Sequence, residues 1–336
     1  MVGATGGGLN LDGSIGDVTV QDGDACGSAT IPSDVEITPG NVLVLFDQSL
    51  TMGDPWQDPS GTSKPKWLAA SDAFVAAVGP ILGDLNLGAI FFPTTEATSL
   101  FDLCTAQSAP IASAPPQIPI SPGATFGPLW SQHFQAPWTL ILGTPLNRAL
   151  DNALLAVQDP SLVGITVVVI FTDGQWTCID STEAGNVAAL FAQGIKTYIV
   201  GLPGALGATG LDQLAQAGGT AAPGCTTNCF LLPADTAQLE QQLAQIAQTT
   251  VSIDSCVITL DPPPPDPSQV HLIVTDSATG NEYEVLLSEG GPDGWTLSPD
   301  GKTATLTGST CDDAKSGAFS SLRFEYGCVS VPPLPA

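Results

Sequence analysis

Residues 42–51, which read VLVLFDQSLT, combine a strand pattern with polar groups directly after it. The apolar run Val42–Phe46 is short and continuous, as in a parallel strand that is covered on both faces of its sheet. The run ends at Asp47, and hydroxyl side chains follow at Ser49 and Thr51. The stretch therefore predicts a central strand whose carboxyl end presents oxygen-bearing side chains.

Strand and helix patterns alternate on the C-terminal side of this stretch. Helices are expected over residues 66–78, 144–157, 182–193, 211–217 and 236–248, and strands over residues 87–92, 165–171, 195–200 and 230–232. Residues 94–140 are rich in Pro and Ser, and we expect one edge strand and a long loop there. This alternation predicts the α/β class, with a doubly wound, mostly parallel sheet covered by helices on both faces.

The pattern changes after residue 250, where short apolar runs are separated by turn signals. Asp300-Gly301, between two such runs, is a hairpin signal. Strands are expected over residues 256–260, 270–275, 282–287, 295–298, 303–307 and 322–326. We therefore expect a small antiparallel β-sandwich over 251–336 and an α/β domain over 39–250. Residues 1–38 are rich in Gly and Asp without a basic residue, which is typical of a solvated tether.

Composition limits the possible partners. The chain has 336 residues, of which 43% are hydrophobic, so it can bury a sizeable core. Thirty-three acidic residues against 7 basic ones give a net charge of -26. Such a surface repels nucleic acid and anionic lipid and attracts divalent cations. No apolar run is long enough for a membrane helix, so we expect no direct membrane insertion.

Oxygen ligands gather at the ends of the expected strands. Asp47, Ser49 and Thr51 follow the first strand, and Asp173 follows the strand over 165–171. Thr144 opens a helix between them. Functional loops of a parallel sheet gather at the carboxyl ends of its strands, so these segments should meet. Two carboxylates and three hydroxyls suit Mg²⁺ or Ca²⁺, with Mn²⁺ as a further candidate. In the simpler alternative, Thr144 is only a helix cap and Asp173 only a turn residue.

The pattern Asp47-x-Ser49-x-Thr51, followed by Thr144 and Asp173, resembles the metal-ion-dependent adhesion site of von Willebrand factor type A domains. Thr51 stands where that family usually has Ser, and it keeps the hydroxyl group. The resemblance covers about residues 40–250 and implies a six-stranded sheet in the order 3-2-1-4-5-6, with one antiparallel edge. In the general character of its sequence, the chain is most similar to secreted or lipid-anchored bacterial members with many Cys.

The resemblance implies a function in binding and no catalysis. In the family, an acidic residue of a partner protein completes the coordination of the metal. We therefore expect an extracellular adhesion or interaction module that binds a protein ligand offering Asp or Glu, or another surface component. Trp56 and Trp176 could form a partner-binding rim around the site, or they pack within their loops. The alternatives are a structural building block of a surface assembly, in which metal only stabilises the fold, and a non-catalytic subunit that presents a substrate.

Eight Cys and only two His favour disulfides in an oxidising compartment over a zinc site, with reduced buried thiols as the alternative. A secreted, periplasmic or cell-surface location follows. Residues 1–8 have no signal pattern, so we expect any export signal to have been removed. Sequence leaves the pairing open. With the implied fold, the favoured pairs are Cys104–Cys178, Cys225–Cys229, Cys26–Cys256 and Cys311–Cys328.

Overall fold

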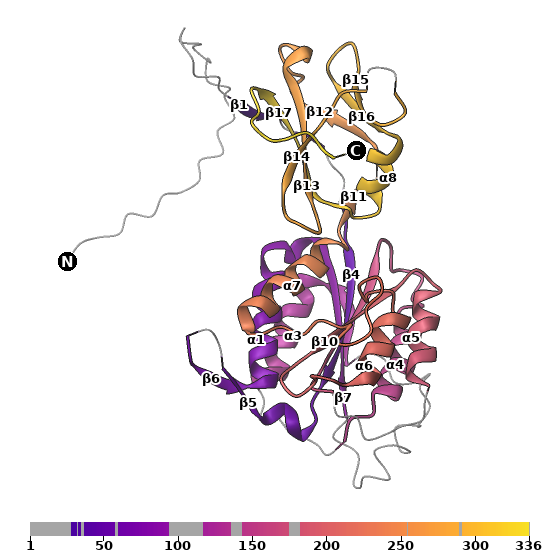
Figure 1. The fold of residues 1–336 in the computed structure, drawn as a ribbon. Coiled ribbons are helices and arrows are strands. Elements are labelled where there is room, and N and C mark those ends of the chain that lie inside the picture. Colours follow the sequence, from indigo (N-terminus) through magenta and orange to yellow (C-terminus); the bar gives the residue numbers. More distant parts are fainter. Residues whose placement is uncertain are drawn as a thin grey trace, which may run out of the picture.

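A computed structural model of the chain describes residues 28–31, 33–34, 37–57, 60–93, 117–135, 143–174, 182–253, 255–288 and 291–335. These residues form an α/β body and a smaller, β-rich body, which lie end to end in Figure 1. No helix in the described ranges is long and apolar enough to cross a membrane.

The α/β body is built on a five-stranded sheet with the strand order β10-β9-β4-β7-β8. Its strands are β4 (Gly40–Asp47), β7 (Leu85–Phe92), β8 (Ile118–Pro122), β9 (Thr166–Thr172) and β10 (Lys196–Gly201). All neighbouring pairs are parallel except β7 and β8, which are antiparallel. This order matches five positions of the order that the family resemblance implies.

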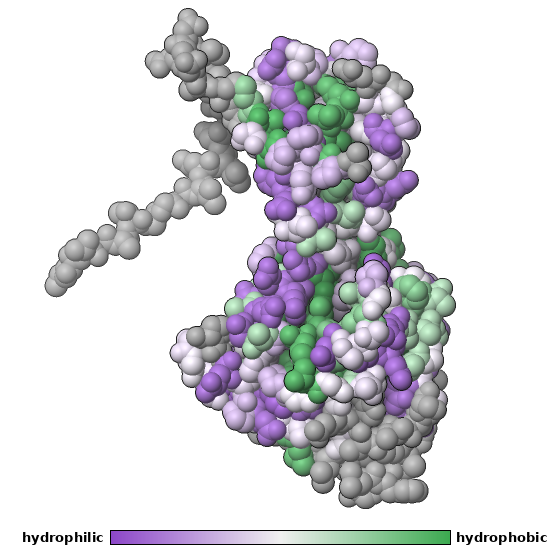
Figure 2. All heavy atoms as spheres, viewed as in Figure 1, coloured by the Kyte–Doolittle hydropathy of each residue, from purple (hydrophilic) through white to green (hydrophobic). Residues whose placement is uncertain are grey.

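The expectation of a sixth strand is wrong for the described residues. Its position next to β10 holds only an isolated parallel bridge between Val200 and Leu231. The Leu231 amide donates to Ile199 O (2.9 Å), and Leu231 O accepts from the Gly201 amide (2.8 Å). The bridge cannot extend far, because Pro233 has no amide hydrogen to donate to a ladder. In Figure 2 a strip of apolar residues lies along the part of the α/β body where Figure 1 labels β10.

Strand β4 is central, and each of its eight residues is buried. Val42, Val44 and Phe46 face one apolar cluster, whereas Leu43 and Leu45 face another. The first cluster contains residues of α1 (Lys66–Val78), α3 (Gly123–Gln135) and α7 (Thr236–Gln248). The second contains residues of α4 (Leu146–Ala156), α5 (Glu183–Phe191) and α6 (Thr209–Ala217). The sheet is therefore covered on both faces, which is why its central strand is a continuous apolar run.

Helix α3 lies in the segment where only a strand and a loop are expected. Gly127 and Pro128 disfavour a helix by propensity, but the helix packs an aromatic face onto the sheet. Trp130 lies against Phe46, with the ring centroids 5.8 Å apart, and its indole nitrogen donates to Ser71 Oγ (3.0 Å). Tertiary packing therefore overrides local propensity here.

The β-rich body consists of two four-stranded sheets, in the orders β1-β17-β13-β14 and β15-β16-β12-β2. All their pairs are antiparallel, as expected of a sandwich. The strands are β1 (Ser28–Ile31), β2 (Ser33–Asp34), β12 (Val257–Leu260), β13 (Val270–Asp276), β14 (Glu282–Val285), β15 (Gly294–Leu297), β16 (Thr303–Thr307) and β17 (Phe319–Gly327), with one unexpected helix, α8 (Gly308–Lys315).

Strands β1 and β2 show that the tether prediction is wrong for residues 28–31 and 33–34. Strand β1 pairs with β17, and Ile31, opposite Phe324, is buried in the core of the sandwich. These residues precede the α/β body in sequence but add strands to sheets that form mainly from residues after 250. Sequence reasoning missed them because two short strands gain stability only from this distant pairing.

The two bodies meet where the chain passes between them. Strand β3 (Ile37–Thr38) pairs with β11 (Ser252–Ile253) at this junction. The side-chain amide of Gln245, on α7, donates to Ala278 O (3.2 Å). Gly317 has φ +76°, and a Cβ there would lie 2.4 Å from Thr249 O. The close approach at the junction therefore requires glycine at position 317.

The remaining short elements lie near the carboxyl end of β4 or in connections. They are η1 (Leu50–Gly53), β5 (Pro55–Gln57), β6 (Ser63–Pro65), η2 (Gly79–Asp84) and η5 (Pro267–Gln269). Strands β5 and β6 form a two-stranded antiparallel ribbon that leads from η1 into α1.

Candidate metal centre

The carboxyl ends of β4 and β9 bring two acidic residues to one edge of the sheet. The two strands pair in parallel up to Phe46 and Phe171, so Asp47 and Thr172 end neighbouring strands. Asp173 follows directly, and both carboxylate residues are buried. The Thr172 hydroxyl donates to Asp47 Oδ2 (2.8 Å). The structure therefore brings the strand ends together, as the sequence analysis expects of a parallel sheet.

Burial shapes the chemistry of Asp47. Desolvation raises the pKa of its carboxyl from the usual 3.8 to about 7. Hydrogen bonds from the Ser49 amide and the Thr172 hydroxyl oppose this rise, whereas the nearby charge of Asp173 adds to it. A positive charge beside Asp47 would favour the ionised form of its carboxyl.

The loop after β4 holds two hydroxyl groups beside Asp47. The Ser49 amide donates to Asp47 Oδ1 (2.8 Å), and Ser49 Oγ lies 3.3 Å from Thr51 Oγ1. Gln48 anchors the loop to the end of β7, because its backbone amide donates to Phe92 O (2.6 Å) and its side chain to Pro93 O. The first motif therefore forms a compact turn that is fixed at both ends.

Thr144 is buried at the entrance to α4, between Gly143, which has φ +97°, and Pro145. Pro145, rather than Thr144, is the N-cap residue of α4. Helix α4 begins two residues after Thr144 and packs against β4 and β7.

Lys66 is a member of this centre that sequence reasoning missed. It is the first residue of α1, and its ammonium donates to Asp173 Oδ2 (3.1 Å). A second carboxylate oxygen, Asp54 Oδ2, lies 3.7 Å from the ammonium. Lys66 is one of only 7 basic residues, and it opens the helix that follows the Asp47 loop. These two facts were the signal in the sequence that could have identified Lys66 as part of the centre.

One oxygen of the centre has no hydrogen-bond partner within the described ranges. Asp173 Oδ1 is fully buried and accepts no hydrogen bond there. A buried, unsatisfied carboxylate oxygen is costly unless a cation or a water satisfies it. The described residues contain no cluster of three or more Asp, Glu, His or Cys side chains, so hydroxyls would complete any ligand set. The donor chemistry fits a hard divalent cation.

The expected aromatic rim differs from the structure. Trp56, on β5, is only 5% exposed and packs into the core, so its prediction as a contact residue is wrong. Trp176 lies outside the described residues. Leu50, within the first motif, is 46% exposed, and Leu206 is 71% exposed. Leu206 belongs to the loop 202–208, which packs on the segment after β9, since a Cβ on Gly174 would lie 3.0 Å from Ala205 Cα.

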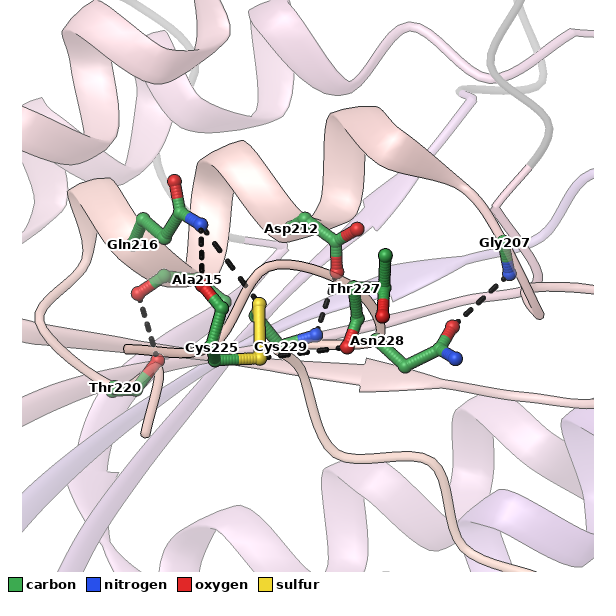
Figure 3. The surroundings of a disulfide bond; sticks show 9 residues. All are labelled: Gly207, Asp212, Ala215, Gln216, Thr220, Cys225, Thr227, Asn228 and Cys229. Carbon is green, nitrogen blue, oxygen red and sulfur yellow. Dashed lines mark hydrogen bonds between the residues drawn. A yellow bond between two sulfur atoms is a disulfide. The ribbon is translucent and has the colours of Figure 1, made fainter. Parts of the chain in front are cut away.

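A disulfide supports the loop 202–208. Cys225 and Cys229 are bonded, as predicted, and Figure 3 shows the bridge beside α6. The Cys229 amide donates to Asp212 Oδ1 (2.6 Å) on that helix. Within the bridged segment, Asn228 Oδ1 accepts from the Gly207 amide (3.1 Å). The disulfide segment therefore contacts the loop that lies against Asp173.

Two other predicted disulfide pairs are wrong. Cys256 is bonded to Cys311, not to Cys26, and Cys311 is therefore not bonded to Cys328. The physical reason is that α8 packs on the sandwich and brings Cys311 to the start of β12, with a Cα separation of 5.6 Å. Cys328 is also in a disulfide, whose partner lies outside the described residues. Cys26, Cys104 and Cys178 are among those undescribed positions, so the Cys104–Cys178 prediction stays a prediction.

Comparison with known proteins leaves the family open. No family model matches the chain, and no curated protein matches it. The chain is similar to several solved structures, among them the conserved hypothetical protein BatB from Bacteroides thetaiotaomicron (13% identity, covering 61% of this chain and 96% of that chain, TM-score 0.42). The pilus adhesin SpaC from Lactobacillus rhamnosus GG is another (11% identity, covering 89% of this chain and 39% of that chain, TM-score 0.42). A third is proximal thread matrix protein 1 from the mussel byssus, with a zinc-occupied MIDAS motif (14% identity, covering 64% of this chain and 47% of that chain, TM-score 0.40).

Proposed function

We propose that the chain is an extracellular interaction or adhesion module that binds an acidic group of a partner through a divalent cation. The observation that carries the proposal is the buried Asp173 Oδ1, which has no hydrogen-bond partner among the described residues and lies next to the strand end that carries Asp47. The residues that would hold the cation are Asp47, Ser49, Thr51, Thr144 and Asp173. Mg²⁺ and Ca²⁺ are the preferred ions, and Mn²⁺ is a further candidate.

The charges of the protein would make the cation the docking point. The net charge of -26 repels acidic partners from the rest of the surface. A divalent cation would supply a local attraction for a carboxylate of the partner, and it would thereby select where that partner binds. The exposed side chains of Leu50 and Leu206 offer apolar contact area near the site. They favour a partner whose acidic residue has apolar neighbours.

The proposed function is binding without catalysis. The two His residues of the chain lie in other surroundings: His133 stacks on Phe91, with a centroid distance of 3.6 Å, and His271 contacts Glu284 in the β-rich body (2.6 Å). Disulfides in both bodies support a secreted, periplasmic or cell-surface location, where an oxidising environment maintains them.

Peptide selection tests the proposal. Displayed short peptides are bound to the immobilised protein in Mg²⁺ and eluted with EDTA. The proposal predicts that the eluted peptides contain Asp or Glu, and that changing this residue to Asn or Gln abolishes binding. Glu240→Gln provides a matched control for charge, since Glu240 is exposed on α7 and lies outside the proposed ligand set, whereas Asp173→Asn should remove all EDTA-sensitive binding.

The outcome also separates the proposal from its main alternative. Peptides that stay bound in EDTA, or whose binding survives Asp173→Asn, would contradict a metal-mediated contact. A rise in Tm with Mg²⁺ and no selected peptide would instead favour a structural building block, in which the metal only stabilises the fold.

A further inference from the structure

The buried ammonium of Lys66 already neutralises the carboxylate that would hold the cation. Its Nζ lies 3.1 Å from Asp173 Oδ2, and the side chain of Lys66 is 6% exposed. A buried ammonium and a buried carboxylate each need a counter-charge, and here each group supplies it to the other. Asp173 is therefore neutralised on one oxygen, Oδ2, while Oδ1 accepts no hydrogen bond from the described residues.

A second acceptor for the ammonium lies towards the solvent. Asp54 Oδ2 is 3.7 Å from Lys66 Nζ, and the side chain of Asp54 is 62% exposed. The backbone ties the two residues together as well, because the Lys66 amide donates to Asp54 O (2.9 Å). A small movement of one flexible side chain would transfer the ammonium from the buried carboxylate to the exposed one.

The loop 202–208 closes this arrangement on its other side. Gly204 has φ +116°, and a Cβ there would lie 3.6 Å from Lys66 Nζ and 3.4 Å from Asp173 O. The loop backbone therefore lies directly against the ion pair. The ammonium is enclosed between α1, the end of β9 and this loop. The fold therefore fixes its position beside Asp173.

We infer that Lys66 is a resident counter-ion that competes with the divalent cation for Asp173 and moves to Asp54 when the cation binds. This inference rests on the proposed function, because it names the group that sets the metal affinity of the same site. An ammonium and a divalent cation repel each other strongly on one buried carboxylate. Metal binding must therefore displace the ammonium, and the site binds metal more weakly than its oxygen ligands alone would.

Lys66→Met tests the inference, since Met has a similar length and volume but no charge. Calorimetry on chelator-treated protein should show Mg²⁺ binding that is tighter by about tenfold or more. Without metal, the Tm of the variant should fall, because Asp173 loses its counter-charge, and Mg²⁺ should raise that Tm more than it raises the Tm of the wild type. Lys64→Met is the matched control: it removes the same charge two positions earlier, from a surface pair with Asp72, and should change the affinity by less than about twofold.

Asp54→Asn provides a second variant that keeps the fold, because Asp54 is exposed. It removes the acceptor for the displaced ammonium and should weaken Mg²⁺ binding by about threefold or more, whereas Asp72→Asn should not. In the Lys66→Met background, Asp54→Asn should have less than about a twofold effect, since no ammonium remains to be moved.

The possible results distinguish this inference from the proposed function. Equal or weaker Mg²⁺ binding by Lys66→Met would overturn the inference and leave the proposed function intact. Binding by Lys66→Met alone, without any by the wild type, would support the inference and contradict the proposed function. If neither protein binds Mg²⁺, both are wrong.

Discussion

The Thr172 hydroxyl donates a hydrogen bond to Asp47 Oδ2 across 2.8 Å and so joins the carboxyl ends of β9 and β4. The hydroxyl oxygen of Thr172 also accepts a hydrogen bond from the Gly174 amide (3.2 Å). One side chain therefore orients the first carboxylate and also fixes the turn that carries the second, Asp173. The geometry of the centre depends on a residue outside the five proposed ligands.

Thr172→Val should lower the free energy of unfolding by about 1–3 kcal/mol, because it leaves a buried carboxylate oxygen and a backbone amide without their partner. Urea unfolding measures this change. Thr197→Val is the matched control: Thr197 is equally buried on the neighbouring strand β10, but its hydroxyl has no hydrogen-bond partner in the described part of the chain. That control should be neutral or stabilising, and equal losses in the two variants would contradict the role of the Thr172 hydroxyl.

Asn228 links the Cys225–Cys229 segment to the loop beside Asp173. Its φ of +52° suits glycine, so Asn228→Gly should keep the backbone while losing the bond to the Gly207 amide. We expect the Gly207 amide to exchange its hydrogen about tenfold faster in this variant, measured by hydrogen exchange. Asn228→Asp keeps an acceptor oxygen and should leave the exchange near the wild-type rate. Equal rates in all three proteins would show that the side chain does not hold the loop.

His133 makes the stability of the α/β body depend on pH. Burial lowers the pKa of its imidazole below the usual 6.5, so the folded protein favours the neutral form. Below pH 6.5 the unfolded chain binds a proton that the folded chain does not, and stability falls with pH until the lowered pKa of the folded state is reached. His133→Phe keeps a flat ring against Phe91 and cannot titrate.

Chemical unfolding of the two proteins between pH 8 and pH 5 measures the difference. The wild type should lose more stability than His133→Phe as the pH falls below about 6.5. Parallel losses would show that His133 titrates normally in the folded state.

Local sequence patterns were sufficient to predict the helices and strands that carry a regular apolar face. Helices α1 and α7 begin and end at the residues that their periodicity predicts, and the run Val42–Phe46 lies within the buried strand β4. Helix α3 was missed because Gly127 and Pro128 hide a helix that aromatic packing stabilises. The pairing of β1 with β17 joins opposite ends of the chain, which periodicity does not reveal.

The candidate site shows the same division. Strand ends placed Asp47 and Asp173 at one edge, because parallel topology follows from the alternation of strands and helices. The contact between Lys66 and Asp173 spans 107 positions and depends on how α1 packs, so no motif contains it. Trp56 was misjudged for a related reason, since it follows the loop in sequence but packs into the core in space.

Calorimetric titration of Mg²⁺ into chelator-treated wild type and Asp173→Asn tests the central claim most directly, with Glu240→Gln as the control. Asn keeps the shape of the side chain but removes the charge that a divalent cation requires. The account predicts one site in the wild type and in Glu240→Gln, and none in Asp173→Asn. Unchanged Mg²⁺ binding in Asp173→Asn, or no binding in the wild type, would contradict it.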